Sequence, residues 1–313
     1  MFHYDIFFGK ILPMSISEFQ VVLFYKYVHI SDTRAFKVWY DSLCEKYTLK
    51  GRTIIAEEGI NGTLEGTYEN TEGFVRELLS DARLSHMQIK RSAGTGSTFP
   101  KCSVKIRNEI VGTRFPQEID PTKSTGVHLA PEELRSWYEQ GKDFVVIDMR
   151  NSYEFDSGHF KNSIDPGMVA SRELPEKMDQ LHQYKDKTVL TVCTGGVRCE
   201  KMSAYLKHKG FKDVYQLDGG MHTYMEKYPG KDFLGTLFTF DNRLTMDFGG
   251  DREIIGTCKR CGEKTETYQN CSNATCNLLF LVCSHCVTDG KVGYCSKACE
   301  DNPVHIVNRV RVW

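Results

Sequence analysis

The sequence predicts a multidomain protein that joins an α+β domain, a parallel α/β domain and a cysteine-rich C-terminal unit. Its 313 residues are too many for one ordinary hydrophobic core. Strand-like and helix-like segments follow two different orders along the chain, and eight of the twelve cysteines lie between Cys258 and Cys299. We therefore expect five segments: a leader over 1–19, a domain over 20–116, a linker over 117–126, a second domain over 127–229 and an extension over 230–313.

The first domain has the element order of a ferredoxin-like sandwich. Apolar spacing predicts a strand, a helix, a hairpin, a second helix and a closing strand, over 21–28, 36–47, 51–66, 71–84 and 102–112. We expect the glycines from Gly59 to Gly62 to supply positive φ angles at the turn of the hairpin. The resulting order, β-α-β-β-α-β, is typical of a ferredoxin-like α+β sandwich.

The second domain alternates strands with helices. A helix with Pro131 in its first turn precedes the short apolar run DFVVIDMR, which is typical of a strand buried in a parallel sheet. A second apolar run, TVLTVC, leads through the loop CTGGVR into a helix that ends at Gly210, and the strand DVYQL follows. This alternation predicts a parallel α/β domain.

Composition and charge exclude several classes of protein. A hydrophobic content of 40% and a net charge of -1 are ordinary for a soluble domain and give no uniformly basic surface. No apolar run is long enough to span a bilayer, and the N-terminal residues lack the basic start and small-residue cleavage site of a signal peptide. We expect a cytoplasmic protein with no membrane partner, whose cysteines are reduced, so that metal binding and nucleophilic chemistry outrank disulfides.

The loop after the second apolar run favours a reactive thiol. Cys193 falls where a parallel strand ends and a helix begins, which is where α/β folds present ligand sites. Gly195 and Gly196 let the backbone curl and turn its N–H groups inward, and with Arg198 this arrangement stabilises negative charge. A thiol there is expected to ionise near neutral pH and act as a nucleophile or sulfur carrier. The alternative is a buried structural cysteine beside a glycine turn.

Two details refine this hypothesis. Four residues, Thr194, Gly195, Gly196 and Val197, separate Cys193 from Arg198, one fewer than in cysteine-based phosphatases, so that the loop fits a sulfur-sized anion better than a phosphate. Cys199 has two interpretations: it forms a disulfide with an oxidised Cys193, or it is the first buried residue of the helix.

The second domain resembles the rhodanese family. The run VIDMR, then Tyr153-Glu154, Gly158-His159-Phe160, CTGGVR and LDGG follow the order of that family's motifs. The resemblance implies a persulfide on Cys193. Asp148, Arg150, Glu154 and His159 match framing motifs, and we expect them to form buried hydrogen bonds that hold the edge of the sheet rather than to take part in chemistry.

The cysteine-rich end predicts metal binding. Four cysteine pairs with two to four residues between partners suit tetrahedral zinc held by four thiolates, and eight ligands allow two ions. Disulfides and partial sites are the alternatives, and the spacing leaves open whether the pairs combine sequentially or interleave. The expected role is structural, because four thiolates leave no open position. The candidate ligands are Cys258, Cys261, Cys271, Cys276, Cys283, Cys286, Cys295 and Cys299.

A basic stretch provides a candidate RNA surface. Between Arg83 and Arg114, seven basic residues stand against one acid, Glu109, with Phe99 and Phe115 available for base stacking. The alternative is a solvated strand surface that is balanced by acids elsewhere. The candidate contacts are Lys90, Arg91, Lys101, Lys105, Arg107 and Arg114.

Four sequence features occur in one order along the chain, between about Val21 and Cys299: AEEGINGTL, CTGGVRCEK, FDNR and the terminal cysteines. With this pattern the whole chain resembles the bacterial tRNA uridine hydroxylase family. The resemblance implies oxygen-dependent formation of 5-hydroxyuridine at the wobble position of tRNA, with the anticodon loop as partner and O2 as co-substrate. No flavin or nicotinamide fingerprint of the G-x-G-x-x-G type is present. The competing hypotheses are a sulfurtransferase that carries a Cys193 persulfide and a zinc-stapled RNA-binding protein without catalysis.

Overall fold

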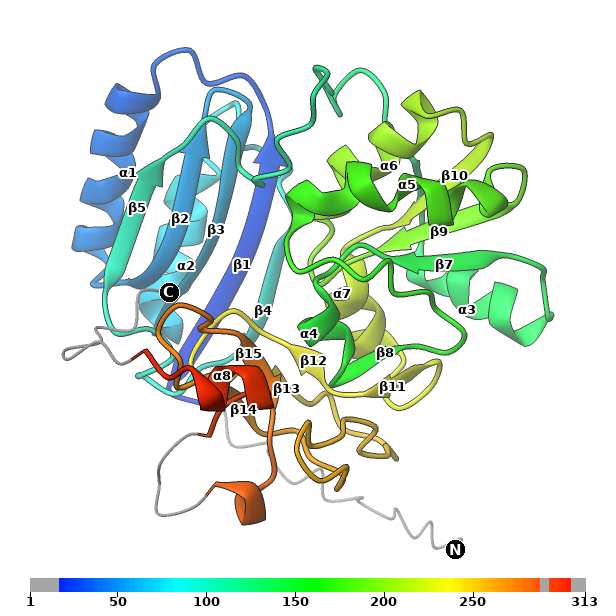
Figure 1. The fold of residues 1–313 in the computed structure, drawn as a ribbon. Coiled ribbons are helices and arrows are strands. Elements are labelled where there is room, and N and C mark those ends of the chain that lie inside the picture. Colours follow the sequence, from blue (N-terminus) through cyan, green and yellow to red (C-terminus); the bar gives the residue numbers. More distant parts are fainter. Residues whose placement is uncertain (1–16, 288–292, 305–313) are drawn as a thin grey trace, which may run out of the picture.

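The computed structural model describes residues 17–287 and 293–304, so the leader expected over 1–19 lies almost wholly outside the described residues. Two α/β domains lie side by side, and the C-terminal residues form a third part below them in Figure 1. Residues 107–126 contain neither helix nor strand and lead from the first domain to the second. No helix in the described ranges combines the length and apolar character needed to cross a bilayer.

The first domain is a five-stranded sheet with helices on one face. The sheet order is β4-β1-β3-β2-β5, and its first four strands have the ferredoxin-like order, which confirms the predicted fold class. The elements are β1 (Phe19–Tyr27), α1 (Thr33–Lys46), β2 (Lys50–Ala56), β3 (Gly59–Thr67), α2 (Tyr68–Leu78), β4 (Ile89–Ala93) and β5 (Cys102–Ile106).

Two details of this domain differ from the prediction. The closing strand is β4, whereas β5, predicted as that strand, is an additional strand that pairs parallel with β2 at the other edge. The hairpin turn falls at Glu57 and Glu58 rather than over Gly59 to Gly62, because the pairing of Ala56 with Gly59 already closes the ladder. Gly59 does have a positive φ, of 146°, but Gly62 lies inside β3.

The two faces of the sheet have different neighbours. Val22 and Phe24 of β1 pack in one apolar cluster with Phe36 of α1 and Phe74 of α2. Because side chains alternate along a strand, Leu23, Tyr25 and Tyr27 point to the opposite face. This face meets the second domain, where the Tyr27 hydroxyl donates to the Val197 carbonyl at 3.2 Å.

The second domain is a four-stranded parallel sheet of order β6-β10-β9-β7, as the sequence predicted. Two apolar clusters, one on each side, contain residues of the strands and of the helices α3, α6 and α7. The elements are β6 (Val127–Leu129), α3 (Pro131–Glu139), β7 (Val145–Asp148), α4 (Ser152–Phe155), β8 (Gly158–Phe160), α5 (Met178–Leu181), β9 (Thr188–Val192), α6 (Val197–His208), β10 (Asp213–Leu217) and α7 (Gly220–Lys227), with short 3-10 turns over 171–177 and 182–184.

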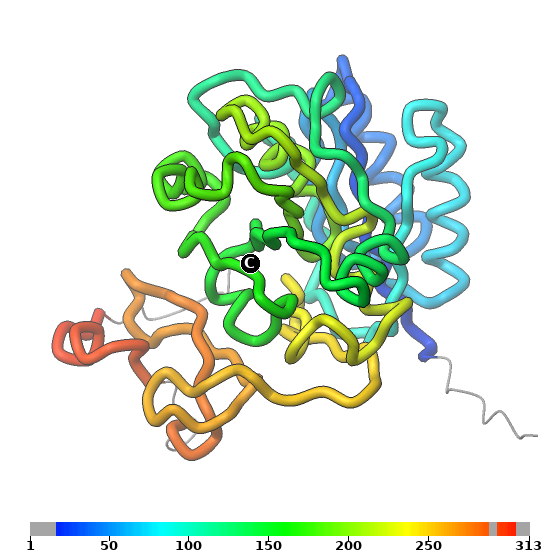
Figure 2. The backbone as a smooth tube through the Cα atoms, turned by 90° about the vertical axis from the view of Figure 1, so that its right-hand side faces the viewer, coloured from blue at the N-terminus to red at the C-terminus, as the bar shows by residue number. Residues whose placement is uncertain are grey.

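The C-terminal part consists of short strands and a small cysteine-lined core. Figure 2 shows its orange and red residues projecting away from the first domain. Four of the six buried residues in its main cluster are cysteines, so apolar packing alone gives it little stability. Its elements are β11 (Phe233–Gly235), which pairs with β8, then β12 (Leu237–Phe238), β13 (Thr245–Met246), β14 (Tyr268–Asn270), β15 (Leu279–Leu281), a 3-10 turn over 284–286 and α8 (Lys297–Asp301).

A candidate active site between two domains

Cys193 lies in a cradle of backbone N–H groups. It follows β9 directly, and Gly196, with a φ of 103°, caps the N-terminus of α6. The N–H of Gly196 donates to the Cys193 sulfur at 3.2 Å. The first turn of a helix places unpaired N–H groups and a positive dipole at this end, so the cradle favours an anionic sulfur.

Helix α7 fixes the other side of the loop. The N–H of Met221 donates to the Cys193 carbonyl at 2.9 Å, and the N–H of His222 donates to the Thr194 carbonyl at 3.0 Å. Gly220 has a φ of 68°, and a Cβ atom on it would lie 2.7 Å from both the Gly196 nitrogen and the Thr194 oxygen. Only glycine fits there, and the loop carbonyls are bonded away from the sulfur.

The two thiols of the loop are tuned in opposite directions. Burial disfavours ionisation of Cys193, but the Cys199 thiol, the charge of Arg198 and nearby backbone N–H groups lower the pKa of Cys193 to about 6. Burial and the neighbouring Cys193 raise the pKa of Cys199 well above its usual value. Near neutral pH the geometry therefore supports a Cys193 thiolate that accepts a hydrogen bond from a Cys199 thiol.

Arg198 reaches the loop but is held by Glu154. Its two terminal nitrogens donate to the two Glu154 oxygens at 2.6 and 2.8 Å, and one of them lies 3.3 Å from the Thr194 hydroxyl. Both side chains are buried. Arg198 acts on the sulfur as a nearby charge, because its guanidinium is already engaged by a carboxylate.

The other framing residues lie behind the loop. Arg150 forms a fully buried ion pair with Asp148 and donates to the Gly158 carbonyl at 2.6 Å. The His159 ring stacks on Phe155 at 3.8 Å, and its Nδ1 lies 3.0 Å from the Phe155 carbonyl. Of the four framing residues, Glu154 is the one that bonds a loop side chain, and the remaining three support the sheet edge.

The first domain covers the loop. We call this contact the seam; it joins Leu23, Tyr25 and Tyr27 of β1 to residues 195–201. A Cβ atom on Gly195 would lie 2.7 Å from the Leu23 side chain, and one on Gly196 would lie 2.7 Å from the Tyr25 hydroxyl. The paired glycines therefore permit close approach of the two domains, and Cys193 is 0% exposed.

Sequence reasoning missed the residues that build the seam. The Tyr25 hydroxyl donates to Glu200 at 3.1 Å, and the ammonium of Lys201, which is buried, lies 2.7 Å from Glu58 and 3.3 Å from Glu109. The sequence did contain a sign of this contact. Tyr25 and Tyr27 alternate with the core residues of β1, so two tyrosine hydroxyls lie on the face of the sheet that the helices α1 and α2 leave uncovered.

The predicted basic residues do not share one surface. Lys101, Lys105, Arg107 and Arg114 are exposed, but Arg91 pairs with Glu72 of α2, and Lys90 is buried at the seam. The prediction that two phenylalanines are available for stacking is wrong. Phe99 is buried, and Phe115 already stacks on Tyr205, with 4.2 Å between the ring centres.

The FDNR motif joins the C-terminal part to the first domain. Asp241 accepts hydrogen bonds from the Arg243 guanidinium, which also donates to Ser92 and to the Ala93 carbonyl at 2.9 Å each. The Asn242 amide donates to the Ser97 carbonyl at 2.8 Å. The motif thus braces β4, the strand that carries Lys90.

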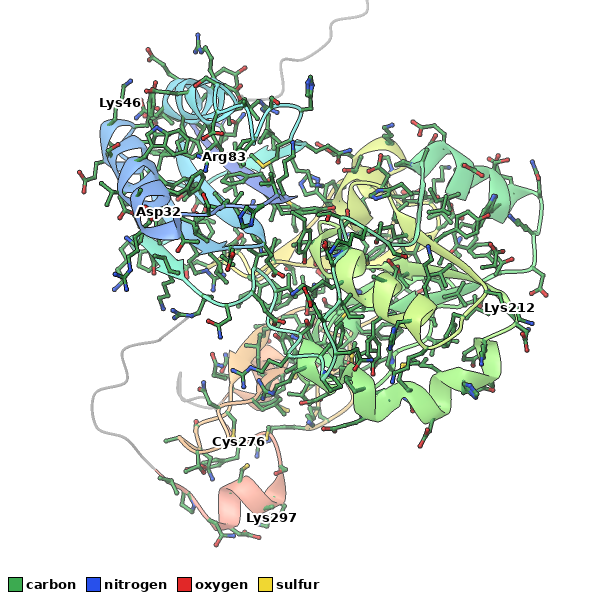
Figure 3. All side chains as sticks on the ribbon, turned by 90° about the horizontal axis from the view of Figure 1, so that it is seen from above. Asp32, Lys46, Arg83, Lys212, Cys276 and Lys297 are labelled. Carbon is green, nitrogen blue, oxygen red and sulfur yellow. The ribbon has the colours of Figure 1, made fainter. Side chains whose placement is uncertain are left out.

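The eight C-terminal cysteines form two groups whose pairs interleave. The first and third pairs converge as Cys258, Cys261, Cys283 and Cys286, and the second and fourth pairs form the other group; the sulfurs of each group lie within 4.8 Å of one another. The sulfurs are 3.5 Å apart in Cys261–Cys283, 3.6 Å in Cys276–Cys295 and 3.8 Å in Cys295–Cys299, close to the roughly 3.8 Å expected around tetrahedral zinc with Zn–S bonds of about 2.3 Å. Each group could hold a metal ion. Figure 3 shows Cys276 of the second group on the C-terminal part, below the two other domains in that view; its partners are Cys271, Cys295 and Cys299.

Comparison with known proteins assigns each part to a class. The rhodanese-like domain matches residues 130–227, the UPF0176 acylphosphatase like domain matches 19–110 and the Rhodanase C-terminal region matches 234–300. The structure therefore combines an acylphosphatase-like domain, a rhodanese-like domain with its loop cysteine, and a cysteine-rich end.

Relatives over almost the whole length give the particular family. A protein from Cytophaga hutchinsonii named tRNA uridine(34) hydroxylase is 39% identical to this chain, over 92% of this chain and 92% of its own length. A protein of the same name from Bacillus velezensis is 40% identical, over 91% of this chain and 89% of its own length. One from Corynebacterium jeikeium is 37% identical over 93% of this chain and 97% of its own. The chain belongs to the tRNA uridine(34) hydroxylase family.

Proposed function

We propose that this protein hydroxylates C5 of the wobble uridine of tRNA, with O2 as co-substrate and Cys193 as the reactive group. The observation that carries the proposal is the match of nine-tenths of the chain to proteins named for this activity. The ionisable Cys193 in its cradle of backbone N–H groups supports the choice of the reactive group. Arg198 stabilises the charge on the sulfur, and Cys199 donates a hydrogen bond to it.

Access to the sulfur is the main requirement of this chemistry. A base that undergoes chemistry is extruded from its stack into a pocket. Because Cys193 is covered by β1, the uridine reaches it when the seam opens, and the glycines at 195 and 196 keep that contact free of interlocking side chains. The anticodon loop, already single-stranded, is a suitable source of an extruded base.

RNA contacts in this proposal come from the exposed part of the basic stretch. Lys101, Lys105 and Arg107 lie on or beside β5, the edge strand, with Arg114 beyond it. Phosphates of a tRNA loop would bind there through charge. Lys90 and Arg91 are engaged elsewhere and are not part of this surface.

We further propose that both four-cysteine groups hold zinc with a structural role. The donor chemistry fits, because four thiolates in tetrahedral spacing suit zinc and leave no position for a substrate. When bound, the metal supplies folding energy to a part of the chain with a small apolar core. Reduced thiolates and a tRNA substrate agree with a cytoplasmic protein.

Nucleoside mass spectrometry of cellular tRNA tests the function. We expect 5-hydroxyuridine derivatives to disappear when the gene is deleted and to return with the wild-type protein but not with Cys193→Ala. Cys102→Ala, which changes an exposed cysteine of β5, is the matched control and is expected to restore them. Full restoration by Cys193→Ala would remove Cys193 from the mechanism.

The same loop also favours a second candidate, a sulfurtransferase. A persulfide on Cys193 would be held by the same N–H cradle. In that case deletion of the gene leaves the amount of hydroxyuridine in tRNA unchanged, whereas the amount of a thiolated nucleoside or of a protein persulfide falls. The two outcomes separate the candidates in one experiment.

A further inference from the structure

Lys90 is a buried cation that faces the Cys193 loop from the first domain. It lies in β4 directly opposite Leu23 of β1, and opposite residues in an antiparallel pair share a face of the sheet. Leu23 is the side chain that covers Gly195. Lys90 therefore points into the seam, where it is 5% exposed.

The Lys90 ammonium has no hydrogen-bond partner among the described residues. Its nitrogen lies 5.4 Å from the centre of the Tyr25 ring, a contact that offsets little of the cost of desolvation. Burial is the largest influence and lowers the pKa of Lys90 below its usual value. The negative charges of Cys193, Asp218 and Glu226 act in the opposite direction and offset part of this shift. A buried ammonium without a hydrogen bond requires an anion to offset its cost.

Two other cationic groups near the loop already lie against carboxylates. Arg198 is bonded to Glu154, and His128 lies between Glu200 and Asp218, at 3.5 and 3.7 Å. The buried His222 Nδ1 lies 3.5 Å from Glu226 and has no hydrogen-bond partner among the described residues. The Lys90 ammonium remains available to a negative sulfur. The titratable groups on the elements that face Cys193 or Lys90 are Tyr25, Tyr27 and Lys90 from the first domain and Glu154, Arg198, Cys199, Glu200, Asp218, His222 and Glu226 from the second.

We propose that Lys90 is a positioning residue whose ammonium is the counter-ion of the anionic sulfur on Cys193, so that the reactive centre is assembled from two domains. The inference rests on the proposed function only for the role of Cys193 as the reactive group. In the closed seam the first domain then keeps the sulfur ionised before a substrate enters, and opening of the seam moves the ammonium away from the sulfur.

A purely structural role for Lys90 predicts the opposite stability change. If Lys90 served packing, Lys90→Met would lower the unfolding temperature. If it is held in place for the sulfur, Lys90→Met relieves a buried unpaired charge, and the unfolding temperature stays the same or rises while the thiolate is lost.

The test is the ultraviolet absorbance of the thiolate as a function of pH. Subtraction of Cys193→Ser from wild type isolates the Cys193–Cys199 pair, since the other thiolates, including any that bind metal, cancel. The step at lower pH belongs to Cys193, because the pKa of Cys199 lies well above its usual value. The midpoint for wild type is expected near the pKa of about 6. The same subtraction in the Lys90→Met background is expected to give a midpoint higher by about one unit or more.

Two further variants complete the experiment. Lys90→Arg keeps the charge and is expected to keep the midpoint low. Lys26→Met removes a lysine from the other face of the same sheet, where its ammonium donates to the Ser85 carbonyl, and is expected to leave the midpoint unchanged.

An unchanged midpoint in a folded Lys90→Met protein overturns the inference, even if hydroxyuridine formation is lost. A raised midpoint supports the inference that Lys90 is the counter-ion, even if neither the wild-type protein nor any variant makes hydroxyuridine. In that case the proposed function is wrong, but the assignment of Lys90 is retained. The two proposals are therefore tested separately.

Discussion

Ten of the twelve cysteines lie in two regions of this protein, the Cys193 loop and the C-terminal end, and their surroundings there are opposite. At the seam, Cys193 stands with one neighbouring thiol, an N–H cradle and an arginine that is already paired. At the C-terminal end, eight cysteines converge in two groups of four with little apolar packing around them. The first arrangement stabilises charge on one sulfur, and the second brings four sulfurs within reach of one ion.

The difference shows what decides the role of a thiolate. A single sulfur among N–H donors has no other thiolate to share a metal with, and it remains free to react. Four sulfurs at tetrahedral spacing repel one another unless a cation binds between them. The two regions therefore depend on different interactions. Backbone hydrogen bonds and buried ion pairs hold the Cys193 loop, whereas metal coordination holds the C-terminal end. We expect a substitution in one region to leave the structure of the other unchanged.

The largest effect is expected from loss of a metal ligand. Cys283→Ser removes one sulfur from the first group, so the metal content should fall from two ions per chain to one. Because zinc binding supplies about 10 kcal/mol or more to small zinc domains, residues around β15 should lose protection from hydrogen exchange. Metal analysis and exchange mass spectrometry measure the two changes.

The Cys193 thiolate titration is the internal reference for this variant. It should be unchanged in Cys283→Ser, because the seam is held by different contacts. Cys102→Ser, outside both groups, should retain two ions. Two ions in Cys283→Ser would show that this cysteine is not a ligand.

The next effect concerns the buried ion pair behind the loop. Glu154→Gln leaves the Arg198 charge buried without a carboxylate, which typically costs about 3–5 kcal/mol. We expect a clear fall in the free energy of unfolding of the second domain, measured by chemical denaturation, with both metal ions retained.

Glu132→Gln is the matched control for this prediction. Glu132 pairs with Lys227 at the exposed surface, where solvent screens the charges, so its loss should change stability little. Equal effects of Glu132→Gln and Glu154→Gln would mean that burial does not govern these pairs.

The place of the loop in the fold could be predicted from the sequence because its geometry is local. The strand-to-helix position of Cys193, the glycines and the spacing to Arg198 are set within a few residues. The fold classes of both domains also followed from element order. What could not be predicted depends on the other domain: β4 is short and polar because Lys90 faces the seam and Arg91 pairs with α2, so its sequence IKRSA resembles a surface loop.

The combination of the cysteine pairs depends on a hairpin that the sequence barely signals. Strands β14 and β15 pair Tyr268 with Leu281 and Asn270 with Leu279. Cys271 and Cys276 therefore lie at the tip of the hairpin and Cys283 at its base, which separates the second pair from the third. Interleaving follows from this placement, and cysteine spacing alone does not contain it.

The smallest effect is expected at the edge of the seam, where His128 is about half exposed. The carboxylates of Asp218 and Glu200, 3.7 and 3.5 Å from the ring nitrogens, raise the pKa of His128 to about 10, against the effect of burial. A raised pKa contributes stability that is complete below the unfolded value of 6.5 and is lost as pH rises through about 10. Solvent screening limits the contribution to at most about 1 kcal/mol.

His128→Gln should therefore lower the denaturation midpoint slightly near pH 6 and leave it unchanged above about pH 10. His208→Gln, at the exposed end of α6, corrects for general effects of pH. A difference from wild type that grows with pH would contradict the assignment, because the charged form of His128 is the one that Asp218 and Glu200 stabilise. Together with Glu154→Gln, this result would order the ion pairs of the second domain by burial, from the enclosed loop outward to its solvent-exposed rim.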